Sequence, residues 1–111
     1  MVPPRLLGAF EQLTILAILG QRAEASGVGI ARTLERTTRR PVSRAALYTT
    51  LNRLETKGLV RWRLRPAKGD WRRARRIYSI TSRGLVAIRA ARREWARLAS
   101  GLEHVLDALP M

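Results

Sequence analysis

Residues 43–58 predict one well-bounded helix, and this helix constrains the fold more than any other stretch of the chain. Ser43 is a good N-cap, because its hydroxyl can accept a hydrogen bond from a free backbone N–H of the first turn. Gly58 provides the left-handed residue that commonly ends a helix. Leu47, Leu51 and Leu54 form an apolar stripe with helical spacing. The stripe predicts that one side of the helix is buried.

The other sides of this helix carry hydrogen-bonding and cationic groups. They are Arg44, Tyr48, Thr49, Asn52 and Arg53. Such side chains contact phosphates and base edges in nucleic-acid complexes, and the N-terminus at Ser43 favours an anion. We therefore expect a recognition helix at residues 43–57. In this prediction Tyr48 and Arg53 contact phosphates, whereas Arg44, Thr49 and Asn52 read bases.

The charge of the chain points to the same kind of partner. The 111 residues are enough for one small domain, and 22 basic against 8 acidic residues give a net charge of +14. A balance this basic favours a polyanionic partner, with nucleic acid ahead of a membrane surface. Because an excess of arginine can also reflect genomic composition, the placement of the arginines carries more weight than their number.

Several classes of protein are disfavoured. The chain has no cysteine, which excludes disulfides and thiolate metal sites. No apolar run approaches the roughly 20 residues of a membrane span, and the N-terminus lacks a signal-peptide pattern. The only histidine is His104, and no paired carboxylates suggest an active site or a metal site. We expect a soluble cytoplasmic protein that is not an enzyme and holds no cofactor.

Two helices are expected before the recognition helix. Residues 6–19 are apolar on nearly all sides, so this helix is either central to the core or shared with a second subunit. A stop at Gly20 and a polar connector at residues 21–25 follow. Ser26 then caps a helix at residues 27–36, whose two glycines are expected to allow close packing. With the turn at residues 37–42, this helix and the recognition helix form a helix-turn-helix unit.

After Gly58 the pattern changes to an alternation of period two. Val60, Trp62 and Leu64 alternate with arginines, which predicts a strand with one buried face. Turn chemistry at residues 66–70 and a second strand at 72–80 complete a β-hairpin, or wing, within residues 59–80. Its charge is consistent with a solvated edge that resists aggregation. We favour contact with a nucleic-acid backbone, made by Lys68, Arg72, Arg73 and Arg75.

The last segment predicts a long helix that begins after Thr81 or Ser82 and runs to about residue 109. Apolar residues recur there with heptad spacing, which is typical of helix pairing. The predicted dimer seam consists of Ile88, Ala91, Trp95, Leu98, Leu102 and Val105. The alternative is a stripe that covers its own domain. Residues 1–80 are thus expected to form a winged DNA-binding domain, and residues 81–111 a dimerisation helix within the same compact unit.

Four segments together resemble the PadR-type transcriptional regulators. They are residues 8–13 (GAFEQL), 47–55 (LYTTLNRLE), 57–60 (KGLV) and 75–81 (RRIYSIT). The resemblance spans residues 8–106, although residues 26–30 (SGVGI) replace a Tyr-Gly-Tyr-Glu-Ile type of sequence. It implies a mainly α fold with a β-hairpin wing, a winged helix-turn-helix. It also implies a dimer built from the first and last helices, and most members repress transcription.

The leading hypothesis is therefore a homodimeric repressor that binds a palindromic operator in double-stranded DNA. Some small PadR-like regulators bind planar aromatic molecules beside a tryptophan of the last helix, and Trp95 lies in the middle of the predicted seam. Trp95 is thus a candidate for an effector site, the alternative being a large core residue. The second hypothesis is a non-specific, arginine-rich nucleic-acid-binding protein, either architectural or RNA-binding.

Overall fold

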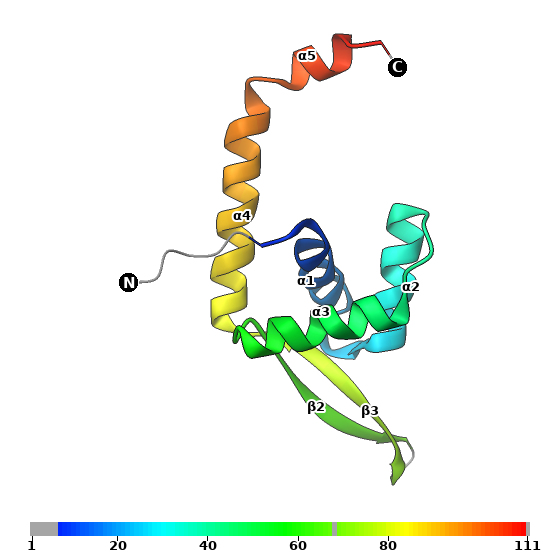
Figure 1. The fold of residues 1–111 in the computed structure, drawn as a ribbon. Helices are drawn as coiled ribbons and strands as arrows, with labels where there is room; N and C mark the ends of the chain where they lie inside the picture. Colours follow the sequence, from blue (N-terminus) through cyan, green and yellow to red (C-terminus); the bar gives the residue numbers. More distant parts are fainter. Residues whose placement is uncertain (1–6, 68, 111) are drawn as a thin grey trace.

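The computed structural model describes residues 7–67 and 69–110, which form five α-helices and a three-stranded antiparallel sheet (Figure 1). The helices are α1 (Ala9–Gln21), α2 (Gly27–Thr38), α3 (Arg44–Thr56), α4 (Ser82–Ser100) and α5 (Glu103–Ala108). The strands are β1 (Ala25–Ser26), β2 (Val60–Ala67) and β3 (Asp70–Ile80), and a 3-10 turn, η1 (Arg22–Glu24), precedes β1. This mixed arrangement confirms the predicted class, a helical protein with a β-hairpin wing.

The first helix differs from the prediction at both ends. Gly8 is the N-cap of α1, and the Glu11 carboxylate accepts a hydrogen bond from its backbone N–H at 2.9 Å. Gly20 lies inside the helix and does not stop it. The helix ends because Arg22 adopts a positive φ of 56° and donates its N–H to the Leu19 carbonyl. Residue 6 lies outside the described residues.

The predicted polar connector contains a short strand. Ala25 is fully buried and pairs with Tyr78 of β3, so β1 is part of the core. Ser26 caps α2 as predicted, since its hydroxyl accepts a hydrogen bond from the Gly29 N–H at 3.1 Å. The helix continues to Thr38, two residues beyond the predicted end.

The caps and the buried stripe of α3 are confirmed. The Ser43 hydroxyl accepts a hydrogen bond from the Ala46 N–H at 3.2 Å, and Gly58 has a φ of 76°. Leu47, Leu51 and Leu54 are fully buried. They pack with side chains of α1, α2 and the base of the sheet in one apolar core, which fixes the opposite side of α3 toward solvent.

The sheet has the order β1-β3-β2, and β2 and β3 form the wing. Val60 is buried and Trp62 half-buried, as predicted, but Leu64 is 46% exposed. The expectation for Leu64 was wrong because the hairpin extends beyond the helices that cover its base (Figure 1). The second strand starts at residue 70 instead of 72, so the turn is tighter than predicted. Lys68 lies outside the described residues.

The single C-terminal helix expected from the heptad pattern is two helices. Thr81 caps α4, accepting a hydrogen bond from the Gly84 N–H at 3.1 Å, but α4 ends at Ser100. Gly101 then donates its N–H to the Ala99 carbonyl, and α5 turns away from the axis of α4 (Figure 1). Glycine is among the poorest helix formers, so the helix gains little by continuing through Gly101. Leu102 and Val105 therefore do not continue a straight seam.

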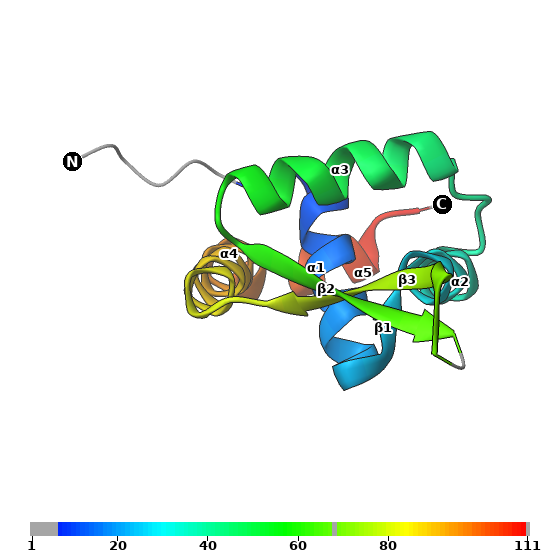
Figure 2. The ribbon, with the colours of Figure 1, turned by 90° about the horizontal axis from the view of Figure 1, so that it is seen from below.

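The elements are arranged so that α3 and the wing lie beside each other. Seen from below, α3 runs along one side of the hairpin base, with α4 near one end and α2 near the other (Figure 2). The helix α5 lies at the opposite end of the molecule from the wing tip (Figure 1). None of the helices in the described ranges is both long and apolar enough to cross a membrane.

Candidate nucleic-acid interface

One side of α3 displays the whole predicted recognition set. All of its members on this helix are exposed to solvent: Arg44, Tyr48, Thr49, Asn52 and Arg53. Ser43 is also exposed, at the N-terminal end of α3. Thr50 is also buried, on the same side of α3 as the leucines. The leucine stripe alone did not predict this. The helix thus separates a buried face from a face of hydrogen-bonding and cationic groups.

Tyr48 lies over the start of α2. A Cβ atom placed on Gly27 would come within 2.5 Å of the Tyr48 hydroxyl oxygen, so the ring occupies the space that a side chain would need. At Gly29 a Cβ atom would clash with the amide of Gln21, whose nitrogen donates to the Gly29 carbonyl and to the Thr33 hydroxyl. The expectation that the two glycines allow close packing is confirmed.

The C-terminal end of α3 is held by an ion pair. Lys57 Nζ donates to Glu11 Oε2 at 2.7 Å, and the Glu11 side chain is only 8% exposed. Burial alone would raise the pKa of Glu11, but the hydrogen bonds from Lys57 and from the Gly8 N–H outweigh it and lower the pKa. This pair links α3 to the first turn of α1. The residues lie far apart in the sequence, and no local pattern indicated that they meet.

The wing carries a dense group of exposed cationic side chains. Among the described residues these are Arg61, Arg63, Arg72, Arg73, Arg75 and Arg76. Arg72, Arg73 and Arg75 belong to the predicted phosphate-contacting set, whereas Lys68, the fourth member, lies outside the described residues. Arg61 and Arg63 are two further basic residues of the predicted hairpin, and they alternate with the apolar residues of β2.

Three arginines of the hairpin have partners in the fold: Arg65, Arg72 and Arg76. Arg65 forms a two-point ion pair with the Glu24 carboxylate in η1, and its guanidinium lowers the pKa of Glu24. Arg76 stacks over the Trp62 ring, with its central carbon 4.1 Å from the ring centroid. Arg65 is thereby tied to η1 and Arg76 to β2, and Arg73 and Arg75 are exposed to solvent.

The predicted dimer seam divides into a buried and an exposed part. Ile88 is buried in the core of its own chain and Ala91 is half-buried. Trp95 and Leu98, farther along α4, are 70% and 75% exposed. Leu102 and Val105, beyond the break, are exposed as well. The first turns of the stripe thus cover the domain itself, which was the alternative considered for the whole stripe.

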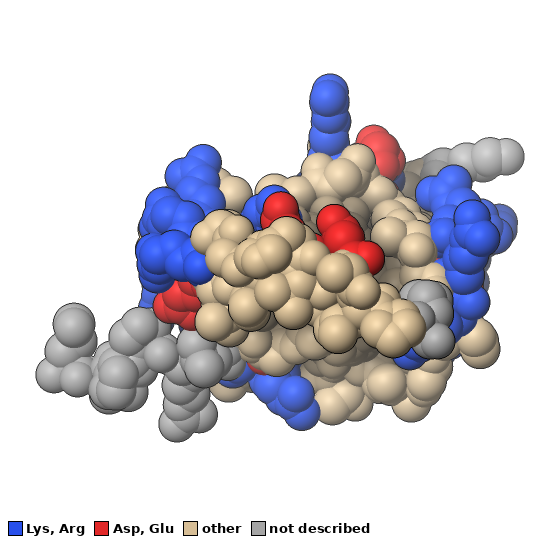
Figure 3. Space-filling model, turned by 90° about the horizontal axis from the view of Figure 1, so that it is seen from above, with Lys and Arg blue, Asp and Glu red and all other residues tan. Residues whose placement is uncertain are grey.

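Charge is distributed unevenly over the surface. Seen from above, the face that includes α5 is mostly free of Lys and Arg, and the basic side chains gather on its flanks (Figure 3). The acidic residues Glu103 and Asp107 lie on α5. In a chain with a net charge of +14, such a face contrasts with the arginine-rich wing.

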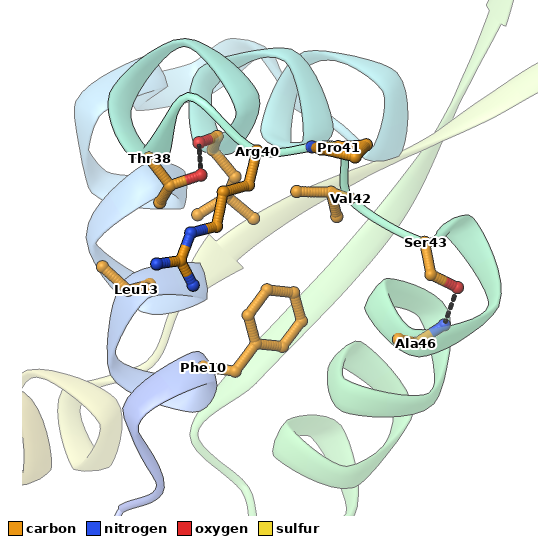
Figure 4. Close-up of a pocket in the computed structure, with 9 residues that line it drawn as sticks. Phe10, Leu13, Thr38, Arg40, Pro41, Val42, Ser43 and Ala46 are labelled. Atoms are coloured by element: carbon orange, nitrogen blue, oxygen red, sulfur yellow. Dashed lines mark hydrogen bonds between the residues drawn. The ribbon is translucent and has the colours of Figure 1, made fainter.

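A pocket of about 490 Å³ lies between α1 and the turn that leads from α2 into α3. Phe10 and Leu13 of α1 form one wall, and Pro41 and Val42 of the turn form another (Figure 4). The Arg40 side chain extends over the opening (Figure 4). Trp95 does not line this pocket, so the structure does not bring the candidate effector residue to it. Within the described residues, no group of three His, Asp or Glu side chains is placed to bind a metal.

Comparisons with solved structures give many neighbours with the same fold. A PadR-like transcriptional regulator from Bacillus cereus strain ATCC 14579 aligns with a TM-score of 0.75 at 22% identity, covering 92% of this chain and 95% of that one. A PadR family regulator from Eggerthella lenta DSM 2243 aligns with a TM-score of 0.68 at 24% identity, with 88% and 84% covered. A protein from Streptococcus mutans UA159 aligns with a TM-score of 0.70 at 21% identity, with 100% and 98% covered.

At these identities the likeness concerns the fold. No curated protein matches the sequence. The sequence model of the family described as "Transcriptional regulator PadR-like family" matches residues 15–90. This match spans the helix-turn-helix unit, the wing and the first half of α4, which is more than half of the chain. The chain therefore belongs to the PadR-like family of transcriptional regulators.

Proposed function

We propose that this PadR-like regulator is a homodimer that represses transcription by binding a palindromic operator in double-stranded DNA. The observation that carries the proposal is the pairing of two surfaces. A capped helix presents Arg44, Thr49 and Asn52 to solvent, and an arginine-rich hairpin lies beside it. Helices of this kind enter the major groove while neighbouring cations hold the backbone.

Each predicted residue has a role in this proposal. Arg44 suits guanine and Asn52 suits adenine, because their donors and acceptors match those base edges, and Thr49 can bond to either. Tyr48, Arg53 and Ser43 position the helix on phosphates. On the wing, Arg72, Arg73 and Arg75 follow the backbone together with Lys68. In this proposal, residues 1–80 therefore form the DNA-binding part of the chain.

Residues 81–111 are assigned to dimerisation. Trp95, Leu98, Leu102 and Val105 are apolar side chains exposed to water, and exposed apolar surface of this kind favours contact with a partner. The low density of basic side chains on the face that includes α5 favours contact between two copies of a chain that otherwise repel each other (Figure 3). A two-fold dimer would place two copies of α3 about one helical turn of DNA apart, or a multiple of it.

Release by a small aromatic effector beside Trp95 is part of the proposal. Trp95 lies in the C-terminal half of α4 and its indole is exposed, so it is available to stack on a planar molecule at the junction of two copies. The test is to titrate a panel of planar aromatic molecules and to measure the fluorescence of Trp95. If none of them changes this fluorescence, the role is contradicted.

The first test is fluorescence anisotropy with the duplex upstream of the protein's own gene and a scrambled duplex of equal length. At about 150 mM salt, where loose electrostatic binding is weakened, a specific regulator should prefer the native duplex by roughly 10³-fold or more. Equal binding that collapses as salt rises would favour the second candidate, a non-specific nucleic-acid-binding protein. The net charge of +14 is the observation that supports that candidate.

A further inference from the structure

Trp71 occupies an unusual position at the tip of the wing. The tip is closed by the Ala67–Asp70 pair, with Gly69 at a φ of 82°. The Asp70 carboxylate then accepts a hydrogen bond from the Arg72 N–H at 3.0 Å, a local turn that has Trp71 between its two partners. The indole is 64% exposed. Trp71 thus follows the closing turn directly, and its large apolar ring lies in water.

Trp71 does not serve the core or the proposed dimer face. The other tryptophan of the hairpin, Trp62, is half-buried against the core and covered by Arg76. Trp71 is absent from that core. The wing tip and α5 lie at opposite ends of the molecule (Figure 1), so the apolar surface of α4 and α5 is far from this indole. The exposure of Trp71 calls for a partner of a different kind.

The charge around Trp71 indicates the chemistry of that partner. Arg72 and Arg73 follow it directly and are exposed, and Arg75 lies two residues farther along. The nearby acid, Asp70, is already engaged by Arg72. An aromatic ring within a cationic surface suits a nucleic acid, since the cations contact phosphates and the ring contacts sugars and bases.

The length of the wing indicates which groove the tip can reach. The eight residues of β2 extend about 27 Å at the rise typical of a strand. Half a turn of duplex DNA, which separates a major groove from the next minor groove, is about 17 Å. With α3 in the major groove, the tip is thus long enough to reach the minor groove that flanks it.

We propose that Trp71 is a minor-groove wedge that inserts between base pairs at the flank of each half-site. Apolar side chains inserted in this way unstack a base step and kink the duplex toward the major groove. Pyrimidine–purine steps unstack most easily, so Trp71 selects flanks that contain TA or CA steps without forming a hydrogen bond to a base. The inference rests on the proposed DNA-binding function and adds a determinant of sequence preference to it.

The test uses the full chain and duplexes enriched from a pool of randomised sequence. In each enriched duplex 2-aminopurine replaces adenine at successive flanking positions, because its fluorescence rises when the base unstacks. The unmodified protein should raise the signal at one flanking step, and Trp71→Ala should abolish the rise and weaken binding by about 10-fold. Trp71→Phe should retain part of both effects.

Leu64→Ala is the matched control, because Leu64 is another exposed apolar residue of the same hairpin. It should keep the 2-aminopurine signal. Since Trp71→Ala removes no charge, its salt dependence should equal that of the unmodified protein. If Trp71→Ala raises the 2-aminopurine fluorescence as much as the unmodified protein does, the wedge is overturned, while the proposal of sequence-specific DNA binding is not. An equal loss of affinity on TA flanks and on rigid A-tract flanks would also overturn it. A pool without any enriched sequence would overturn both the wedge and sequence-specific binding.

Discussion

Gly27 has no side chain at the point where the Tyr48 ring lies over the start of α2. The hydroxyl end of Tyr48 is the part that approaches most closely, and it belongs to an exposed, rotatable side chain. A methyl group at residue 27 would therefore displace the ring more readily than the backbone. Position 27 thus controls where the proposed phosphate-contacting hydroxyl sits.

Gly27→Ala should weaken DNA binding while changing the free energy of unfolding by less than about 1 kcal/mol, within the usual range of a helix-propensity change. In a Tyr48→Ala background the same substitution should have no further effect on binding, so the double-mutant cycle should be non-additive. Gly20→Ala is the control, because a Cβ atom there meets nothing within 4 Å. Binding by anisotropy and urea unfolding give the two quantities. Additive effects of the Gly27 and Tyr48 substitutions would contradict the coupling.

At the scale of elements, the Lys57–Glu11 pair fixes α3 against α1. Because the pKa of Glu11 is lowered in the folded protein, the stabilisation is fully present above the unfolded value of 4.5 and decreases as pH falls through the folded value. Glu11→Gln should therefore cost about 1–2 kcal/mol of unfolding free energy at pH 7. Urea titrations give the free energy of unfolding of both proteins, and the difference between the two values should decrease at a pH below 4.5.

Glu24→Gln provides a contrast for this measurement. The Glu24–Arg65 pair is exposed, so its contribution is screened by solvent and should be smaller than that of Glu11. A Glu11→Gln cost that stays constant from pH 7 to strongly acidic pH would show that the carboxylate charge is not what holds the two helices together.

Elements that depend on local chemistry could be predicted from the sequence. Ser26, Ser43 and Thr81 each cap a helix by accepting a hydrogen bond from the backbone N–H three residues ahead. A short stretch of sequence is therefore enough to predict such a cap. The break at Gly101 was missed because heptad spacing indicates which side chains share a face, and it does not report whether the backbone ladder is continuous. The strand β1 has only two residues, too few for any periodic pattern.

Contacts between distant residues could not be predicted from the sequence. Lys57 and Glu11 are 46 positions apart, and only the packing of α3 on α1 brings them together. The exposed face of α3 followed from its buried leucine stripe, because fixing one side of a helix fixes the other. The roles of Arg44, Thr49 and Asn52 on bases remain a prediction, since amino-acid type indicates which base edge suits a side chain and not which base it meets.

At the scale of the molecule, α4 and the wing extend from the core in different directions (Figure 1). The exposed apolar residues Trp95 and Leu98 of α4 therefore lie apart from the arginines of the wing. This separation suits a protein in which one region joins two copies and the other contacts a polyanion. Two linked copies bind two half-sites together, because the second contact becomes intramolecular once the first has formed. Dimerisation should therefore set both the affinity for the operator and the number of phosphates neutralised.

Leu98→Glu should separate the dimer and so weaken operator binding. Leu98 is 75% exposed on α4, and a carboxylate there would be buried against its counterpart in the second copy. Because a monomer neutralises half as many phosphates, the slope of log affinity against log salt should fall to about half.

Val86→Glu is the control, because Val86 lies on the same helix, is similarly exposed (65%) and undergoes the same change of charge. Val86 lies off the predicted seam, so the substitution should leave the association state and the slope unchanged. Sedimentation velocity gives the association state, and anisotropy at several salt concentrations gives the slope. Identical behaviour of the two variants would mean that the exposed face of α4 is not the surface that joins the copies.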